Sequence, residues 1–284
     1  MSQSRSEAIL VWILRKMALL AAAIVLLIVL FLIRETLPIL QTIGLSRFFN
    51  DPDWHPTSAE FNLLPMLWGT LFVTAGSVLL ATPLGIASAI FCHYYAPQAI
   101  ASLYRRLIEL LAGIPSVVYG FWGLVVLVPI IGRIHPPGAS LFTGILILTL
   151  MILPTIALLA DASLANVPPE YERGCAAVGL GRWATVRGVV FPAASSGLIT
   201  GVILGTGRAI GETMAVLMVC GNVVQIPTSV FDPVRTLTAN IALEMAYAVG
   251  DHRAALFVSG LVLMAMVVTL VIAAELLNKG QIYD

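Results

Sequence analysis

Six apolar runs, each long enough to cross a lipid bilayer, most constrain what this chain can fold into. A bilayer core about 30 Å thick needs about 20 apolar residues per helix. Only 11% of the 284 residues are charged, whereas soluble domains carry roughly 25%, so lipid is the main solvent. We predict an all-α integral membrane protein with about six transmembrane helices, at 12–33, 65–91, 107–131, 140–160, 190–218 and 254–277.

The first run is either a retained helix or a cleaved signal peptide. Arg15 and Lys16 precede the apolar residues 17–33. The run is longer than the apolar region of a usual signal peptide, and no small-x-small cleavage site follows it before Arg34. We therefore expect a retained helix. Residues 1–60 would form this helix and an outer loop, and residues 61–284 a core of about five helices.

The positions of arginine and lysine predict the orientation. With a cytoplasmic N-terminus, nine of the fifteen fall in inside segments and five in outside segments, with Arg208 inside a span. The positive-inside rule then places both termini in the cytoplasm. The nine inside residues are Arg5, Arg15, Lys16, Arg105, Arg106, Arg173, Arg182, Arg187 and Lys279.

Several classes of chemistry find no support in the composition. The formal net charge is zero, so nothing suggests nucleic-acid binding. Cys92, Cys175 and Cys220 are odd in number and widely spaced, which predicts neither a disulfide framework nor a metal site. The two lysines, 16 and 279, lie in no Gly-x-x-x-x-Gly-Lys-Ser/Thr loop. We expect no catalytic residue, no metal and no bound cofactor here, so any ATP hydrolysis falls to another chain.

Two predicted outer loops, 34–64 and 219–253, are long enough to carry structure. The first holds four acidic residues, Trp54, Pro52 and Pro56, and the second holds a polar turn and a helical stretch at 236–248. The apolar side chains of that stretch can lie along the membrane surface. Either loop can dock an external partner or serve as a simple connection.

The longest predicted inner loop, 161–191, is typical of a short rigid element. Proline suits the first position of a helix and acids favour its first turn, so Pro169, Glu170 and Glu172 indicate a helix start. Gly179 is placed to end that helix. Small residues on an exposed helix would let another protein approach closely, and a helix–turn–helix can transmit a push to the adjoining spans. An ordinary amphipathic loop is the alternative.

The fifth run contains two charged residues, Arg208 and Glu212. A spacing of four places both on one face of a continuous helix, where they can pair. An intramembrane arginine costs about 2.5–3.5 kcal/mol on insertion scales, so it persists where it is paired or faces a cavity. Gly197, Gly201 and Gly205 recur every four residues, which allows close helix packing. We predict an ion pair facing a transport path, with a purely structural ion pair as the alternative.

The third run is interrupted by Gly113 and Pro115. Such a break at membrane depth is tolerated where the freed backbone groups face protein or water. Ser116 and Tyr119 stand at the break and can offer hydroxyls to a solute. Glu109 can pair with the arginine four residues before it or with the one in the fifth run. A packing kink is the alternative.

The inner loop resembles the coupling loop of ABC importer permeases. That loop combines a glutamate, small residues, a glycine and a proline thirteen residues beyond it, and Gly179 and Pro192 have this spacing. The glutamate of the family stands six residues before the glycine, where this chain has Arg173, with Glu172 one residue earlier. Gly174 and Cys175 stand where the family usually has alanines.

The segments 109–123, 172–192 and 207–222 are together similar to the phosphate-specific transport (Pst) permeases, in particular their C-type subunit. This likeness runs over about residues 65–277. It implies a type I ABC importer permease fold in the plasma (inner) membrane. The implied partners are a related A-type permease forming a heterodimer, two ATPase subunits that use ATP and Mg, and an external phosphate-binding protein.

The resemblance also implies two groups of site residues. The substrate translocation residues would be Arg208, Glu212, Thr213, Glu109, Ser116 and Tyr119. The ATPase coupling residues would be Glu172, Arg173, Ala176, Ala177, Gly179 and Gly181.

The mechanism implied is alternating access, driven by ATPase subunits that close on residues 168–187. Arg208 is the leading candidate for contact with the anion, because a guanidinium can hold two phosphate oxygens at once. Glu212 would pair with Arg208 when the path is empty, and it can accept a hydrogen bond from a protonated phosphate oxygen. A permease for phosphonate, molybdate or sulfate is the first alternative. A stand-alone secondary transporter is the second, although the sequence lacks the inverted repeat expected of one.

Overall fold

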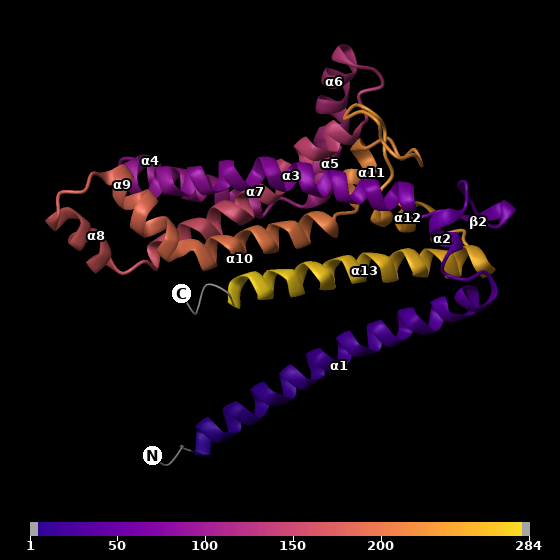
Figure 1. Cartoon of the computed structure of the whole chain (residues 1–284), viewed down its shortest axis with the longest axis horizontal. Coiled ribbons are helices and arrows are strands. Elements are labelled where there is room, and N and C mark those ends of the chain that lie inside the picture. Colours follow the sequence, from indigo (N-terminus) through magenta and orange to yellow (C-terminus); the bar gives the residue numbers. More distant parts are fainter. Residues whose placement is uncertain (1–4, 280–284) are drawn as a thin grey trace.

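The computed structural model describes residues 5–279, and within them the side chains of residues 7 and 9–276. This part of the chain is predominantly helical and is elongated along one direction (Figure 1). The prediction of six transmembrane helices is confirmed, although the third and fifth spans have different bounds. The helical stretches long and apolar enough to cross a membrane are Ile9–Thr42, Leu64–Tyr95, Ser116–Ile134, Leu141–Ala165, Arg182–Ile210 and Gly250–Leu276.

The core of the bundle forms around α7 (Leu141–Ala165), which packs against α3 (Leu64–Ile90) and α10 (Phe191–Ile210). Glycines on the two flanking helices allow this close approach. A Cβ at Gly205 would lie 2.9 Å from Cγ1 of Ile156, and one at Gly85 would lie 3.0 Å from its Cγ2. The glycine repeat of the fifth run therefore serves helix packing, as predicted. The buried α7 side chains include Ile147, Leu148, Met151, Ile152 and Ile156.

The third span begins at Ser116 instead of residue 107. The preceding residues form a separate helix, α4 (Gln98–Ala112), which ends at Gly113 and packs on α7. Pro115 has no N–H to continue the helical hydrogen bonds, so the interruption divides the predicted run into two pieces. The span itself consists of α5 (Ser116–Trp122), the π-helical turn η3 (Gly123–Leu127) and α6 (Val128–Ile134).

The fifth span also ends earlier than predicted, at Ile210 instead of residue 218. Gly211 stands at the C-cap of α10, and the chain resumes a helix only at α11 (Met214–Val219). The span starts earlier, with α9 (Arg182–Thr185) and the π-helical turn η4 (Val186–Val190) leading into α10. Thus both runs that the sequence marked with unusual residues are divided by a helix break, which lies just before the third span and just after the fifth.

Gly120 holds α5 against α11. A Cβ at position 120 would lie 2.8 Å from Cα of Ala215 and 3.3 Å from the carbonyl oxygen of Met214, and backbone cannot turn aside as a side chain can. We expect Gly120→Ala to lower the free energy of unfolding in detergent by about 1–3 kcal/mol. Gly188→Ala is the matched control, because no atom lies within 4 Å of its built Cβ. Equal thermal stability of the two variants would contradict the packing of α5 on α11.

The outer loop 34–64 is a structured element. It contains α2 (Arg47–Asn50), β1 (Trp54–His55), η1 (Pro56–Ser58) and β2 (Glu60–Phe61). The two strands pair antiparallel, with Trp54 opposite Phe61. The Asp51 carboxylate accepts a hydrogen bond from the Phe61 N–H at 3.0 Å and pairs with Arg47 Nε at 2.9 Å. The loop is therefore more than a connection, and its docking of an external partner stays a prediction.

The helical stretch for which the sequence allowed a place along the membrane surface is α12 (Leu237–Glu244), and the structure packs it against the bundle instead. Leu237 is fully buried, and α12 packs on α13 (Gly250–Lys279) and on α3. The Leu237 N–H donates a hydrogen bond to the Thr70 hydroxyl of α3 at 3.0 Å, and Thr236 caps the helix start by accepting from the Ala239 N–H. These contacts hold α12 against the helices of the bundle.

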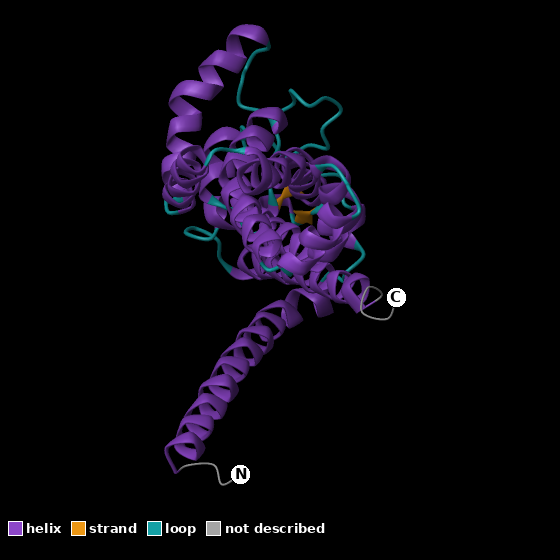
Figure 2. Cartoon of the chain, turned by 90° about the vertical axis from the view of Figure 1, so that its left-hand side faces the viewer, coloured by secondary structure: helices purple, strands orange, loops and turns teal. Residues whose placement is uncertain are grey.

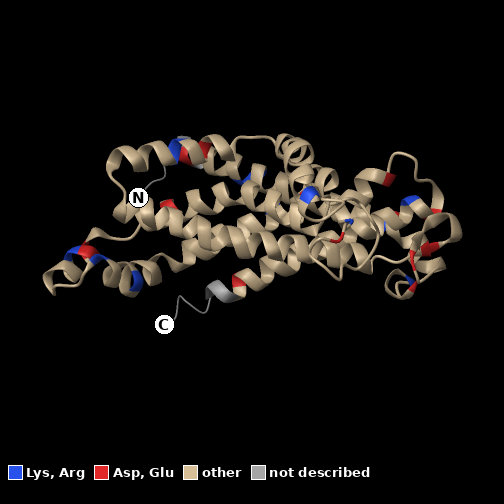
Figure 3. Cartoon of the chain, turned by 90° about the horizontal axis from the view of Figure 1, so that it is seen from above, with Lys and Arg blue, Asp and Glu red and all other residues tan. Residues whose placement is uncertain are grey.

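The two ends of the bundle are distinct. The start of α1 (Arg5–Thr42) and the end of α13 lie at the same end as α8 (Pro169–Ala177) and α9, while β2 and α12 lie at the other end (Figure 1). With distance from the end that carries β2 and α12, α1 diverges from the rest of the bundle (Figure 2). Charged residues gather toward the two ends (Figure 3). The orientation prediction also used Arg5 and Lys279, whose side chains are not among those that the structure describes.

Candidate functional sites

Arg208 lies in the last turn of α10 and is not paired with Glu212. Its guanidinium Nη1 donates a hydrogen bond to the Thr155 hydroxyl of α7 at 3.2 Å, and the residue is half-buried. Among the described residues it makes no ion pair. The predicted pairing is wrong because the helix ends between the two residues, so a spacing of four no longer places them on one face. The Glu212 carboxylate instead accepts from the Ala215 N–H at 3.0 Å, at the start of α11.

An unpaired guanidinium at this position constrains function. Figure 1 shows that α10 ends well short of the end of the bundle that carries β2 and α12, and Arg208 lies in the last turn of the candidate membrane span Arg182–Ile210. An arginine there requires water, an anion or a partner chain to solvate its charge. A Cβ built on the adjacent Gly207 would meet no atom within 4 Å, so there is open space beside Arg208. This arrangement suits a site that an anion enters and leaves.

The break between α4 and α5 supplies the other predicted translocation residues. The Tyr119 hydroxyl donates to the Leu111 carbonyl oxygen at 2.9 Å, so it satisfies a backbone group at the end of α4. Tyr119 is buried. Ser116 is half-buried, and its hydroxyl makes no hydrogen bond within the described part of the chain. Of the two hydroxyls, that of Ser116 is the one open to a solute.

Glu109 does not make either of the ion pairs that the sequence suggested. It is exposed on α4, and no cation among the described side chains pairs with it. Arg105 is bound elsewhere, through Nε and Nη2 to the two carboxylate oxygens of Asp161 at 2.8 and 3.0 Å. A bidentate pair to a carboxylate on a neighbouring helix outcompetes a single contact along the same helix. The structure thus separates Glu109 from Arg208.

The helix break between α10 and α11 is held in place by a hydrogen bond from α12. The Thr238 hydroxyl donates to the Glu212 carbonyl oxygen at 2.7 Å, and the Thr213 hydroxyl donates to the Gly211 carbonyl oxygen at 3.3 Å. Thr213 and Glu212 are both half-buried. Backbone groups freed by the break are therefore partly satisfied within the protein, as membrane depth requires.

The predicted helix in the inner loop is confirmed as α8. It ends in the double hydrogen bond of a Schellman motif, in which Leu180 N–H donates to the Cys175 carbonyl at 3.0 Å and Gly179 N–H to the Ala176 carbonyl at 3.1 Å. Gly179 has φ +77°, a left-handed conformation that favours glycine. The glycine therefore ends the helix, as its position in the sequence predicts.

The surface of this loop is open and carries both charged and apolar side chains. Arg173, Ala176 and Ala177 are exposed, and a Cβ built on Gly174, Gly179 or Gly181 meets no atom within 4 Å. Glu172 differs from the other predicted coupling residues, because it is half-buried and accepts a hydrogen bond from the Tyr94 hydroxyl at 3.1 Å. The exposed large apolar side chains here are Tyr171, Val178, Leu180 and Trp183.

We expect Gly179→Val to destabilise the end of α8. A β-branched residue at positive φ costs about 1–2 kcal/mol, so the helix should open locally more often. Limited trypsin digestion measures this directly, because Arg173 and Arg182 lie on either side of the turn. Gly179→Asn is the graded control, since asparagine tolerates this conformation. Cleavage of Gly179→Val at the wild-type rate would contradict the strained-turn argument.

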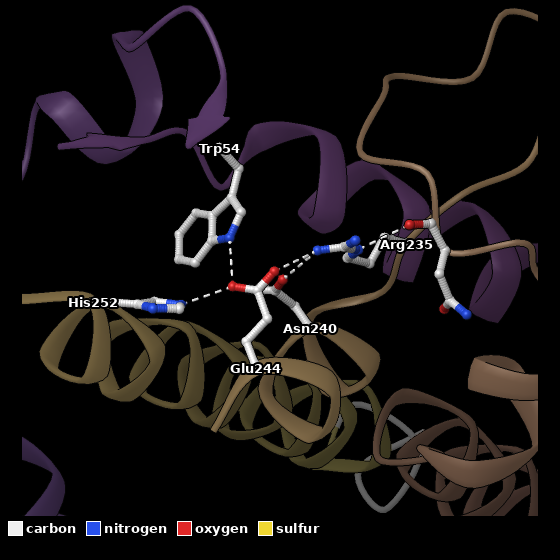
Figure 4. A network of polar contacts seen from close by, with 6 residues as sticks. Trp54, Arg235, Asn240, Glu244 and His252 are labelled. Atoms are coloured by element: carbon white, nitrogen blue, oxygen red, sulfur yellow. Dashed lines mark hydrogen bonds and ion pairs between the residues drawn. The ribbon is translucent and has the colours of Figure 1, made fainter. Parts of the chain in front are cut away.

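A third site was not predicted from the sequence. Glu244 of α12 is buried and its carboxylate binds three groups (Figure 4). Oε1 accepts from Arg235 Nη1 at 2.7 Å, and Oε2 accepts from Trp54 Nε1 at 2.9 Å and lies 2.8 Å from His252 Nε2. Trp54 and Glu244 are 190 positions apart, and no spacing rule connects them. The signal in the sequence was only a set of polar residues in two outer loops.

Six helices long and apolar enough to cross a membrane, helix breaks just before the third and just after the fifth, and an exposed helical loop at one end are typical of an integral membrane transport component. The family model described as "Binding-protein-dependent transport system inner membrane component" matches residues 81–282. The chain belongs to this family. The predicted resemblance to ABC importer permeases is therefore confirmed, and the protein is a multi-pass membrane protein.

Individual relatives agree with this assignment. The chain is 43% identical over 226 residues to the probable ABC transporter permease protein YqgH of Bacillus subtilis (strain 168), covering 78% of this chain and 73% of that protein. It is 38% identical over 257 residues to the phosphate transport system permease protein PstC of Mesorhizobium japonicum, covering 83% and 78% of the two chains.

Solved ABC transporters share the fold. A chain of the MetNI methionine ABC transporter, in an inward-facing conformation, superposes with a TM-score of 0.63 at 19% identity, covering 77% of this chain and 95% of that one. A chain of a bacterial alginate ABC transporter, in complex with a periplasmic protein, superposes with a TM-score of 0.65 at 16% identity, covering 93% and 92%. At these identities the likeness shows the fold alone, which is that of type I ABC importer permeases.

Proposed function

We propose that this chain is one permease subunit of an ATP-driven phosphate importer and forms part of its translocation path. The observation that carries the proposal is Arg208, which is half-buried in the last turn of a candidate membrane span, has no ion-pair partner in the described chain and follows the uncrowded Gly207. Relatives named as phosphate permeases support phosphate as the anion.

The chemistry of the path follows from three side chains. The Arg208 guanidinium, held by Thr155, binds phosphate oxygens through its remaining N–H groups. The Ser116 hydroxyl adds a weaker contact. Glu212 commits only Oε1 to the α11 backbone, so Oε2 accepts from a protonated phosphate oxygen, which sulfate does not offer. Because Glu212 does not neutralise Arg208, water fills the empty site.

The partners complete the proposed cycle. A related A-type permease forms the other half of the path, and an external phosphate-binding protein delivers the anion at the end that carries the β1–β2 hairpin. Two ATPase subunits close on the exposed surface of α8 and α9 in the cytoplasm, which places the start of α1 and the end of α13 on the cytoplasmic side. ATP and Mg belong to those subunits, and this chain binds no cofactor.

Phosphate uptake into proteoliposomes tests the proposal. The chain is co-expressed with its candidate partners, and ATP-dependent uptake of radiolabelled phosphate is measured with an excess of sulfate, molybdate or phosphonate as competitor. Uptake that requires this chain and an ATPase, and that resists these competitors, is the expected result. Competition by another oxyanion would reassign the substrate, and uptake without any ATPase would refute the transporter class.

A further inference from the structure

The inner end of α3 is a π-helical turn, η2 (Phe91–Tyr95), that faces two elements at once. The Tyr94 hydroxyl donates to Glu172 Oε1 of α8 at 3.1 Å. The adjacent His93 places Nδ1 3.8 Å from Asp161 Oδ1 of α7. A π-helical turn within an α-helix often marks a functional site. Here it gives consecutive side chains the directions needed to reach both α7 and the inner loop.

Asp161 connects this turn to a further helix. Its two carboxylate oxygens accept from Nε and Nη2 of Arg105 on α4. The end of α3, α4, α7 and α8 therefore meet at five polar side chains. We call these the inner junction: His93, Tyr94, Arg105, Asp161 and Glu172.

Little else holds α8 to the end of α3. A cavity of about 350 Å³ lies between η2, α8 and α9, lined by His93, Tyr94, Glu172, Ala176, Leu180 and Arg182. In the part of the chain that the structure describes, the Tyr94–Glu172 bond is the one side-chain hydrogen bond from α8 to another element. The loop thus borders an open cavity next to α3, and the Tyr94–Glu172 hydrogen bond is the side-chain link across it.

We propose that Glu172 is a positioning residue that acts inward, with its bond to Tyr94 carrying displacements of α8 to the end of α3. The Arg105–Asp161 pair then passes the movement to α4 and α7. The inference rests on the proposed function, because an ATPase must push on α8. It also assigns two roles to the predicted coupling residues. The exposed small and apolar side chains contact the ATPase, whereas Glu172 contacts Tyr94 of this chain.

Tyr94→Phe tests the link by removing one hydroxyl. In the reconstituted complex, we expect radiolabelled phosphate taken up per ATP hydrolysed to fall by up to about tenfold, because a hydrogen bond to a charged group is lost. The ATPase subunits should still co-purify. Tyr95→Phe is the matched control, because Tyr95 is exposed and makes no side-chain hydrogen bond in the described structure. An unchanged ratio in Tyr94→Phe would overturn the proposal.

Glu172 variants distinguish an inward role from contact with the ATPase. Glu172→Gln keeps an oxygen that can accept from Tyr94 and should keep a ratio near that of the wild type. Glu172→Ala should lose as much as Tyr94→Phe, and the double variant should be no worse than either single one, because both remove the same bond. Additive losses, or loss of ATPase co-purification with Glu172→Ala alone, would overturn the inward role.

A second readout does not depend on which anion is transported. Cys92 is buried in the same π-helical turn, so its rate of maleimide labelling reports movement there in a Cys175→Ser, Cys220→Ser background. Addition of Mg-ATP should change this rate in the complex, and Tyr94→Phe should suppress the change. An equal response in both would refute the link. Failure of phosphate uptake in the wild-type complex, with the labelling difference intact, would refute only the proposed substrate.

Discussion

Arg208→Gln is expected to assemble normally and to lose phosphate uptake by at least about a hundredfold, because two charge-assisted hydrogen bonds contribute roughly 3 kcal/mol. Glutamine cannot offer the charged fork of a guanidinium. Arg208→Lys keeps the charge without the fork and should fall between the two. The measurement is ATP-dependent uptake in proteoliposomes, normalised to the amount of assembled complex.

The stability of the same variant separates two interpretations of Arg208. An arginine in a structural ion pair would destabilise the protein when replaced, whereas Arg208 has no such partner among the described residues. We therefore expect the thermal stability of Arg208→Gln to change by less than about 1 kcal/mol. Arg133→Gln, at an exposed arginine of α6, is the matched control and should transport normally. Wild-type uptake by Arg208→Gln would end the proposed role.

Glu244→Ala is expected to cause the largest loss of stability of any substitution considered. It leaves Arg235 and the Trp54 indole N–H without the acceptor they share, and removal of one member of a buried ion pair costs about 3–5 kcal/mol. The side chains of Arg235 and Glu244 are still 19% and 10% exposed to solvent. We therefore expect a loss at the lower end of this range, about 3 kcal/mol. Thermal denaturation of the purified protein in detergent measures the effect.

Two further variants make this prediction specific. Glu244→Gln keeps one oxygen acceptor, enough for either Arg235 or Trp54, and should cost less than Glu244→Ala. Glu60→Gln is the control for loss of an outer carboxylate, because its contact with His55 is long, at 4.0 Å, and exposed. Such surface pairs contribute roughly 0–1 kcal/mol. If Glu244→Ala and Glu60→Gln were equally stable, the buried cluster would not hold the outer hairpin to α12 and α13.

Features set by local chemistry could be predicted from the sequence. The apolar runs identified six spans because burying a polar backbone in lipid leaves a helix few alternatives. The proline start and Gly179 placed α8 correctly, because φ preferences act within a few residues. The repeat of Gly197, Gly201 and Gly205 predicted close packing, which the approach of α10 to α7 confirms.

Prediction failed where a helix stopped inside a predicted run. The pairing of Arg208 with Glu212 assumed a continuous helix, but α10 ends at Ile210 and Glu212 turns to the α11 backbone. In the same way, Arg105 was placed beside Glu109 by spacing, although Asp161 of α7 offers it two oxygens. A spacing argument sees one helix at a time, whereas a charged side chain selects its partner from all neighbouring elements.

The sequence alone determined that the chain is a helical membrane protein with an exposed inner helix and an arginine at membrane depth. Only the tertiary structure decided that Arg208 is unpaired, that Glu172 faces Tyr94 and that Glu244 gathers Trp54, Arg235 and His252. The physical reason is the distance along the chain over which each interaction acts. Hydropathy, proline and glycine act over neighbouring residues, while the partner of a buried polar group is fixed by packing between segments far apart in the chain.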